Sequence, residues 1–338
     1  MMRCIDLAKK GLGTTYPNPL VGSVIIHNEK IIGEGWHDQA GKPHAEVNAI
    51  LSVQDQTLLK ESSIYVSLEP CSHFGKTPPC ADLIIEKGIK NVIIGSLDPN
   101  PKVSGKGIEK LISAGCTVTK GILEQECDEL NKRFFTFHKE KRSFIILKWA
   151  ETQDGFIAPG NRIDKNPVWI TNKHSRQLVH KWRAEEQAIL VGTQTVLDDN
   201  PSLSTRDWDG NSPIRIVLDR KLNIPEEATV FDGKVKTFVI TEKEVENKEQ
   251  IIFESINYSD EIAAQICSIL YRCTLQSVII EGGARTLQTF IDANLWDEAR
   301  VFTGNINFKN GTKAPDLKGN IISEEKIKSD ILRIYKND

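Results

Sequence analysis

Hydrophobic positions alternate between two periodicities along the first half of the chain. Short apolar runs at 20–27, 30–37, 63–70 and 91–99 are rich in Val and Ile and are bounded by turn residues, which is typical of strands. Between and after them, residues 45–53, 81–88 and 107–115 carry apolar side chains at helical spacing, and a short apolar stretch follows at 116–122. This alternation of strands and helices predicts an α/β fold.

The second half of the chain starts the same alternation again. It predicts strands at 143–150, 188–192, 213–219, 235–241 and 277–283, and a long helix at 171–187 behind a Thr or Asn cap. A polar run, 139–142, separates the two halves, so we expect one domain at 1–142 and a second at 143–338. Residues 242–250 are highly charged and predict solvated surface, while the tail after residue 304 shows no clear pattern.

Length and composition narrow the class of protein. At about 150 residues per domain, 338 residues indicate two domains. A formal net charge of −3 provides no bulk attraction to nucleic acid or to an anionic membrane. The first 13 residues resemble an amphipathic helix closed by Gly11, and no run of about 18 apolar residues predicts a membrane span. Seven cysteines without an export signal favour a reducing, cytoplasmic setting, where clustered thiols are metal or catalytic candidates.

A first candidate site combines "HAE" with two cysteines, Cys71 and Cys80. One histidine, His44, and two thiolates would leave the fourth tetrahedral position open, as in a catalytic zinc site, and Glu46 could then move protons. Zinc deaminases usually carry two residues between the cysteines, whereas eight stand here. The simpler interpretation keeps His44 as a capping residue, the cysteines as buried thiols and the prolines between them as loop markers.

Four stretches together make the match specific: "TYPNPLVGSVI", "HAEVNAI", "EPCSHFGKTPPC" and "DPNPKVSGKG". They closely resemble the deaminase half of the bifunctional riboflavin-biosynthesis family, which joins a diaminohydroxyphosphoribosylaminopyrimidine deaminase to a 5-amino-6-(5-phosphoribosylamino)uracil reductase. In that family the longer cysteine spacing is normal. The resemblance implies a cytidine-deaminase-like three-layer domain, with His44, Cys71 and Cys80 as Zn²⁺ ligands and Glu46 as the acid and base. It also implies substrate contacts from Asn18, His37, His73, Lys76, Asp98 and Asn100.

The second half lacks the GxGxxG dinucleotide fingerprint and instead carries "SVIIEGGARTLQTFI", a strand, two glycines and a helix. With "LKWAETQDGFIA" and the segment 169–206, this stretch resembles the reductase half of the same family, whose fold is similar to that of dihydrofolate reductase. The resemblance implies NADPH contacts from Ala150, Trp169, Thr171, Thr195, Asp199, Gly282, Gly283, Ala284, Arg285, Thr286 and Leu287. It implies substrate contacts from Lys148, Arg183, Leu203, Arg206 and Glu281. Asn166 and Pro167 stand where the family pattern has a small hydroxyl residue.

The expected function is therefore a two-step enzyme. The resemblance spans about residues 1 to 304 and implies zinc-dependent removal of a pyrimidine amine, followed by NADPH-dependent reduction of the ribosyl group to ribityl. We expect a small phosphorylated pyrimidine as substrate, no nucleic-acid or membrane partner, and a homo-oligomer of unknown size. Two alternatives stay open: a zinc deaminase of another nucleoside or base with an inactive or unrelated second domain, and a non-catalytic zinc protein, which would need a fourth ligand. Which residue handles the proton of the reduction is also open.

Overall fold

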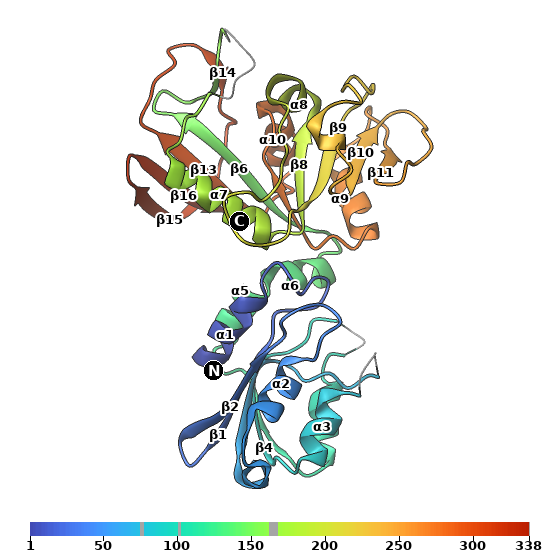
Figure 1. Ribbon diagram of the computed structural model, residues 1–338, viewed down its shortest axis with the longest axis vertical. Coiled ribbons are helices and arrows are strands. Elements are labelled where there is room, and N and C mark those ends of the chain that lie inside the picture. The colour runs from blue at the N-terminus through green and yellow to red at the C-terminus, as the bar shows by residue number, and fades with distance from the viewer. Residues whose placement is uncertain (75–77, 101–102, 162–167, 338) are drawn as a thin grey trace. The chain divides into compact units, whose positions relative to one another are not determined.

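The chain divides into two compact units, Met1–Lys141 and Arg142–Asp338 (Figure 1). The structure, a computed structural model, describes residues 1–74, 78–100, 103–161 and 168–337. Each unit contains one main sheet with helices packed on it, so the predicted α/β class is confirmed. The two units are described separately below.

The first unit is built on a five-stranded sheet of order β2-β1-β3-β4-β5. β1 pairs antiparallel with β2 and β3, whereas β3, β4 and β5 run parallel. The carboxyl ends of the central strands β3 and β4 therefore meet at one edge. The strands are β1 (Gly22–His27), β2 (Lys30–Trp36), β3 (Ser63–Leu68), β4 (Asn91–Ser96) and β5 (Thr117–Thr119).

Helices cover both faces of this sheet. On one face α2 (Ala45–Ser52), α3 (Cys80–Glu86) and α4 (Lys106–Ser113) bury their apolar sides in a single core cluster with the strands. On the other face α1 (Met2–Ala8) packs Cys4 and Leu7 against Val24 of β1. The unit also contains η1 (Lys9–Gly11), η2 (Gln56–Glu61), α5 (Glu124–Leu130), which contacts α1 and β4, and α6 (Lys132–Lys139). The result is a three-layer domain.

The second unit is built on a nine-stranded sheet of order β11-β10-β9-β8-β12-β6-β13-β16-β15. The strands from β11 to β13 run parallel, and β16 and β15 add an antiparallel edge. The parallel strands are β6 (Phe144–Thr152), β8 (Ala188–Gly192), β9 (Ile214–Leu218), β10 (Thr237–Thr241), β11 (Ile251–Ser255), β12 (Ser277–Ile280) and β13 (Glu298–Gly304). The antiparallel ones are β15 (Asn320–Ile327) and β16 (Asp330–Lys336), and β7 (Phe156–Pro159) pairs separately with β14 (Gly311–Lys313).

Helices again lie on both faces. On one side α9 (Ile262–Arg272) and α10 (Ala284–Asp292) bury Ile266 and Phe290 in the largest core cluster. On the other side α7 (Lys173–Glu185) and α8 (Thr193–Asp199) pack Trp182 and Val196 against the strands. A 3-10 turn, η3 (Thr229–Phe231), follows β9. The predicted cap of α7 is Asn172, whose side chain accepts hydrogen bonds from the N–H groups of residues 174 and 175.

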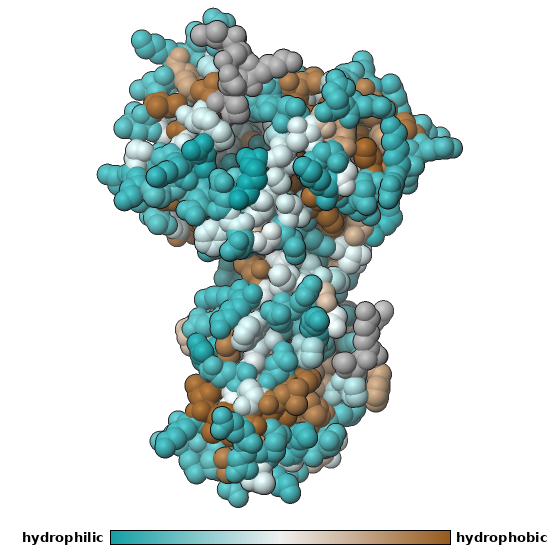
Figure 2. Space-filling view, viewed as in Figure 1, coloured by the Kyte–Doolittle hydropathy of each residue, from teal (hydrophilic) through white to brown (hydrophobic). Residues whose placement is uncertain are grey.

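The tail is where the sequence pattern was least informative. Residues after 304 form β14, β15 and β16, and every residue of β15 except Ile327 is exposed. Residues 242–250 are exposed, as predicted. Most of the face of the second unit seen in Figure 2 is hydrophilic, because its large apolar side chains are mainly buried in the core. None of the helices in the described ranges combines the length and apolar character needed to cross a membrane.

Candidate active sites

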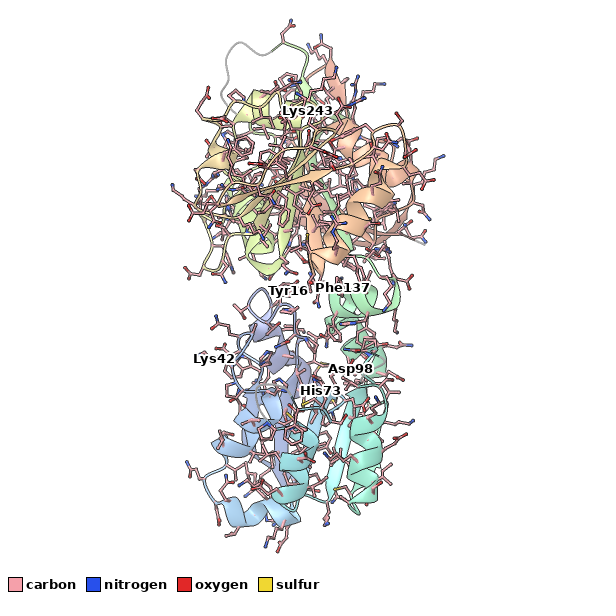
Figure 3. All side chains as sticks on the ribbon, turned by 90° about the vertical axis from the view of Figure 1, so that its right-hand side faces the viewer. Tyr16, Lys42, His73, Asp98, Phe137 and Lys243 are labelled. Carbon is pink, nitrogen blue, oxygen red and sulfur yellow. The ribbon has the colours of Figure 1, made fainter. Side chains whose placement is uncertain are left out.

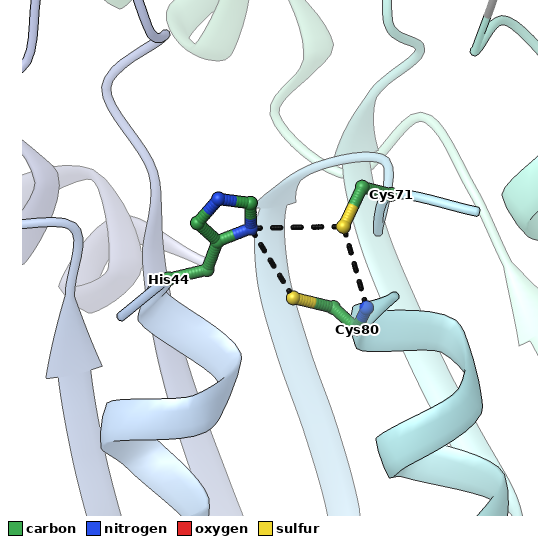
Figure 4. Close-up of side chains that lie close together, drawn as sticks. All are labelled: His44, Cys71 and Cys80. Carbon is green, nitrogen blue, oxygen red and sulfur yellow. Dashed lines mark hydrogen bonds between the residues drawn. The ribbon is translucent and has the colours of Figure 1, made fainter. Parts of the chain in front are cut away.

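Three helix and strand ends bring the predicted metal ligands together. His44 directly precedes α2, Cys80 is the first residue of α3, and Cys71 lies in the loop that follows β3. The Nδ1 atom of His44 lies 3.6 Å from the Sγ atom of Cys71 and 3.4 Å from that of Cys80 (Figure 4). The three donor atoms all lie within 4.8 Å of one another.

This geometry fits a tetrahedral zinc ion. Zinc bonds of about 2.1 Å to nitrogen and 2.3 Å to sulfur, at a tetrahedral angle, separate the two donor atoms by about 3.6 Å. The observed N–S distances agree with that value. The backbone N–H of Cys80 also donates to the Sγ atom of Cys71 at 3.3 Å, which favours a thiolate there. In the described ranges the cluster has three members, so one tetrahedral position is left for water.

Neighbouring groups set the ionisation of the metal-free site. The pKa of Cys71 lies well below the usual thiol range, because the Cys80 side chain hydrogen-bonds to it and His44 lies beside it. The pKa of Cys80 is raised by Cys71 and by burial, and the pKa of His44 is raised by its contact with Cys71. Burial, with the negative charge of Cys71, raises the pKa of Glu46 to about 7. Glu46 is 3% exposed in the first turn of α2, close enough to the sulfurs to interact with both.

The predicted pyrimidine contacts begin with a second histidine. His37 is buried, and its ring meets that of His44 edge to face at 5.3 Å between centroids. Its Nδ1 atom lies 3.1 Å from the carbonyl oxygen of Pro43, so Nδ1 carries the proton and Nε2 accepts from the Asn18 amide at 3.0 Å. Burial lowers the pKa of His37, which keeps the ring neutral. The two residues predicted to face the pyrimidine are thus in contact.

The remaining predicted deaminase contacts come from two loops. His73, exposed between the two cysteines, lies near Asp98, which follows β4 by two residues (Figure 3). Asp98 accepts a hydrogen bond from the backbone N–H of Asn100 at 2.7 Å. Burial raises the pKa of Asp98 to about 6. Lys76 lies outside the described residues, and so do Asn166 and Pro167 of the second unit.

The second unit contains a large cavity of about 1150 Å³ at the carboxyl ends of its parallel strands. Common ligand pockets measure about 300–1,000 Å³, so this one has room for two ligands side by side. All of the predicted reductase residues line it except Leu203 and Gly282. Leu203 is buried in a core cluster with Val191 and Val196. Gly282 is buried so tightly that an added Cβ atom would lie 2.7 Å from the Cα atom of Val191.

A charged trio forms one wall of this cavity. Arg183 donates from two nitrogens to the two carboxylate oxygens of Glu281, at 3.2 and 2.7 Å, and Lys148 approaches the same carboxylate at 4.0 Å. Burial opposes ionisation of Glu281, but the two cations outweigh it and lower its pKa to about 2. Burial lowers the pKa of Lys148, against the pull of Glu281. Glu281 is therefore an anion at any working pH.

Several residues of the cavity or beside the metal site were not predicted, among them Arg176, His180 and Glu69. Arg176, His180 and Arg183 follow one another along α7 at spacings of four and three residues, so they share one face of the helix, and all three line the cavity. Arg176 stacks on Trp169 at 4.2 Å, and the Nδ1 atom of His180 accepts from the backbone N–H of Arg206 at 3.2 Å. That helical spacing was a usable signal. Glu69 lies beside the metal loop, the segment from Cys71 to Cys80. It had no comparable signal in the sequence, because its hydrogen-bond partners are backbone groups.

Comparisons with known proteins agree with both halves. A model described as the cytidine and deoxycytidylate deaminase zinc-binding region matches residues 1–96, and one described as the RibD C-terminal domain matches residues 143–308. The riboflavin biosynthesis protein RibD of Aquifex aeolicus is 41% identical, with 94% of this chain and 89% of that protein covered. The chain belongs to the RibD family. It is thus an enzyme of riboflavin biosynthesis with a deaminase domain and a reductase domain.

Other members of the RibD family support this assignment. RibD of Bacillus amyloliquefaciens is 42% identical, with 94% of this chain and 86% of that protein covered. Among solved structures, a diaminohydroxyphosphoribosylaminopyrimidine deaminase/5-amino-6-(5-phosphoribosylamino)uracil reductase from Thermotoga maritima matches with a TM-score of 0.91 and 39% identity, covering 100% of this chain and 97% of that one. Acinetobacter baumannii RibD, form 1, matches with a TM-score of 0.89 and 29% identity over the same shares. The predicted family is confirmed.

Proposed function

We propose that the first unit deaminates 2,5-diamino-6-ribosylamino-4(3H)-pyrimidinone 5′-phosphate at C2, and that the second unit then reduces its ribosyl group to ribityl with NADPH. The observation that carries the proposal is the convergence of His44, Cys71 and Cys80, with Glu46 beside them, in a chain that also has a reductase cavity. The match to the Thermotoga maritima deaminase/reductase supports the substrate. Self-association and a cytoplasmic location remain predictions, and light scattering would test the first.

In the deaminase step His44, Cys71 and Cys80 would hold Zn²⁺. A bound zinc ion activates a water molecule for attack on the carbon that carries the amine. Glu46 would take a proton from that water, pass it to the ring nitrogen, and deliver a proton to the departing amine. Asn18 and His37, which contact each other beside His44, would hold the pyrimidine edge. His73, Lys76, Asp98 and Asn100 would contact the ribosyl phosphate side.

In the reductase step the cavity would hold NADPH next to the opened ribosylamine. When bound, NADPH supplies the hydride for C1′. The predicted cofactor residues that line the cavity are Ala150, Trp169, Thr171, Thr195, Asp199 and Gly283 to Leu287, and the N-terminal end of α10 among them suits the pyrophosphate. Gly282 does not line the cavity. Because it has no side chain, the chain after β12 can pass close to Val191.

The charged trio indicates how the proton of the reduction is handled. Reduction of the C1′=N bond adds hydride to carbon and a proton to nitrogen. Glu281 is ionised and held by Arg183, so it has no proton to give. Lys148 is buried beside it with a lowered pKa, which makes its ammonium the better acid. We therefore propose that Lys148 delivers the proton and that Glu281 keeps Lys148 charged.

The test follows the two reactions separately. Purified protein receives the diaminopyrimidine ribosyl phosphate, and ammonia release and NADPH oxidation are measured. Cys71→Ser should abolish ammonia release but leave NADPH oxidation intact on pre-deaminated substrate. Lys148→Met should do the reverse, which makes each variant the control of the other. Zinc-loaded wild-type protein that releases no ammonia from this substrate would overturn the proposal.

A further inference from the structure

One buried carboxylate, Glu69, fastens a loop of the deaminase unit at both of its ends. Glu69 follows β3 and is 4% exposed. Its Oε2 atom accepts from the backbone N–H groups of Asp98, at 3.4 Å, and Gly105, at 3.0 Å. Its Oε1 atom accepts from Gly107, at 2.9 Å, and Ile108, at 3.4 Å. The segment between β4 and α4 is therefore hydrogen-bonded to the same side chain at its start and at its end.

These bonds replace the usual local cap of α4. Gly105 precedes the helix in a left-handed conformation, with φ +79°, and no residue there provides a side-chain cap. The free N–H groups at a helix start need an acceptor, and a side chain at the cap position normally provides it. Here the acceptor comes from a residue 36 positions earlier in the chain. This long-range acceptor also ties the start of the helix to the end of β3, which a local cap would not do.

The attachment joins the two walls of the proposed substrate site. Glu69 stands two residues before the metal-binding Cys71, and the loop that it holds starts with Asp98, beside His73 of the metal loop. The contact at Gly107 is close. A Cβ atom added to Gly107 would lie 2.1 Å from the carbonyl oxygen of Pro70 and 3.2 Å from the Oε1 atom of Glu69. The start of α4 at Gly107 therefore lies directly against Pro70, the residue before Cys71.

We propose that Glu69 is a positioning residue of the deaminase site, which holds the Asp98–Asn100 wall against the metal loop so that the ribosyl phosphate side of the substrate is bound. This inference rests on the proposed deaminase function. Glu69 acts through the 98–107 loop and not on the reacting atoms. Its removal should therefore weaken substrate binding much more than it slows the chemical step.

The decisive variant is Glu69→Gln. The amide keeps one acceptor oxygen, but its NH2 group faces two backbone N–H donors, either those of Asp98 and Gly105 or those of Gly107 and Ile108, so two of the four hydrogen bonds that hold the loop are lost. We expect the KM for the phosphorylated substrate to rise at least tenfold, with kcat within about threefold and zinc content unchanged. The same pyrimidine without its ribosyl phosphate should be deaminated equally by wild type and variant. Asp55→Asn is the matched control, since it removes a carboxylate that accepts from a backbone N–H in the same unit but only caps η2.

Other outcomes overturn the inference. If Glu69→Gln loses zinc, or loses kcat at constant KM, Glu69 supports the segment that carries Cys71 and not the substrate wall. If the KM is unchanged, the Asp98–Asn100 segment keeps its position without Glu69. If Glu69→Gln does not fold, Gly107→Ala is measured by the same criteria. Its methyl group would push the start of α4 away from Pro70, while the chain keeps the Glu69 carboxylate. Wild-type protein that shows no deamination would refute the proposed function, which is a separate result.

Discussion

Replacing Glu281 with glutamine would leave two buried cations without their anion. The side chains of Glu281, Arg183 and Lys148 are only 8%, 12% and 15% exposed. Removing one partner of a buried ion pair costs about 3–5 kcal/mol. The pKa of Glu281, about 2, lies well below the usual value of a glutamate near 4.5, and at about 1.4 kcal/mol per pKa unit this gives a second figure of about 3 kcal/mol. The two figures agree, so we expect the second unit to lose about 3 kcal/mol at neutral pH.

The sign of the pH dependence follows from the same pKa. A carboxyl group with a depressed folded-state pKa contributes stability above its unfolded pKa and loses it as the pH falls through the folded value. The difference between wild type and Glu281→Gln should therefore shrink from about 3 kcal/mol near pH 7 to about 1 kcal/mol near pH 3, and nearly vanish below about pH 2. Urea unfolding followed by tryptophan fluorescence would measure it, because five of the six tryptophans lie in the second unit.

Two further variants make the measurement conclusive. The double variant Arg183→Met/Glu281→Gln should cost clearly less than the sum of its single changes, because it leaves one buried cation fewer. Glu324→Gln breaks the exposed pair with Arg333 and should cost less than about 1 kcal/mol. A Glu281→Gln loss that stays constant from neutral to acidic pH, or one no larger than that of Glu324→Gln, would refute the reasoning.

Three other predictions concern the metal centre and the glycine turn. Cys71→Ser should lower zinc content measured by atomic absorption from about one to below about 0.1 per chain; stoichiometric zinc in the variant would exclude Cys71 as a ligand. Glu46→Gln should retain zinc but lower the deamination rate by about 10²- to 10⁴-fold, and a rate close to wild type would remove Glu46 from the chemistry. Gly282→Ala should destabilise the second unit to urea by about 1–3 kcal/mol, since its methyl group would meet Val191; no change in the midpoint would contradict the tight packing.

The central parts of both folds could be predicted because burial and periodicity coincide there. The strands β3, β4, β8 and β12 are short apolar runs between turn residues, and each lies inside a sheet. Burial and periodicity do not coincide in the strand β15. It lies at the sheet edge with nearly all of its residues exposed, so its sequence, "NIISEEKI", carries no alternation that would separate it from a loop. Its pairing with β16 is decided by backbone hydrogen bonds, which composition does not reveal.

The same distinction applies to the sites. His44, Cys71 and Cys80 could be named in advance because metal chemistry restricts the residue types and because both cysteines stand next to prolines at element ends. Glu69 could not, since its four partners are backbone N–H groups that any sequence contains. His180 lies between these cases. Its helical spacing from Arg183 was visible, but its contact with the Arg206 backbone depends on how the loop after α8 folds back.

The charge balance of each site indicates the kind of ligand that it needs. At the metal centre two thiols, one of them with a strongly lowered pKa, and a buried glutamate gather around His44 in a small volume, so groups that can become anionic outnumber the one group that can become cationic. The reductase cavity shows the opposite imbalance, because six Lys and Arg side chains line it against four Asp and Glu: Lys148, Arg176, Arg183, Arg206, Arg220 and Arg285 against Asp198, Asp199, Asp207 and Glu281. An excess of positive side chains around a cavity attracts anionic ligands. This arrangement of charges favours a cation in the first unit and anionic ligands in the second.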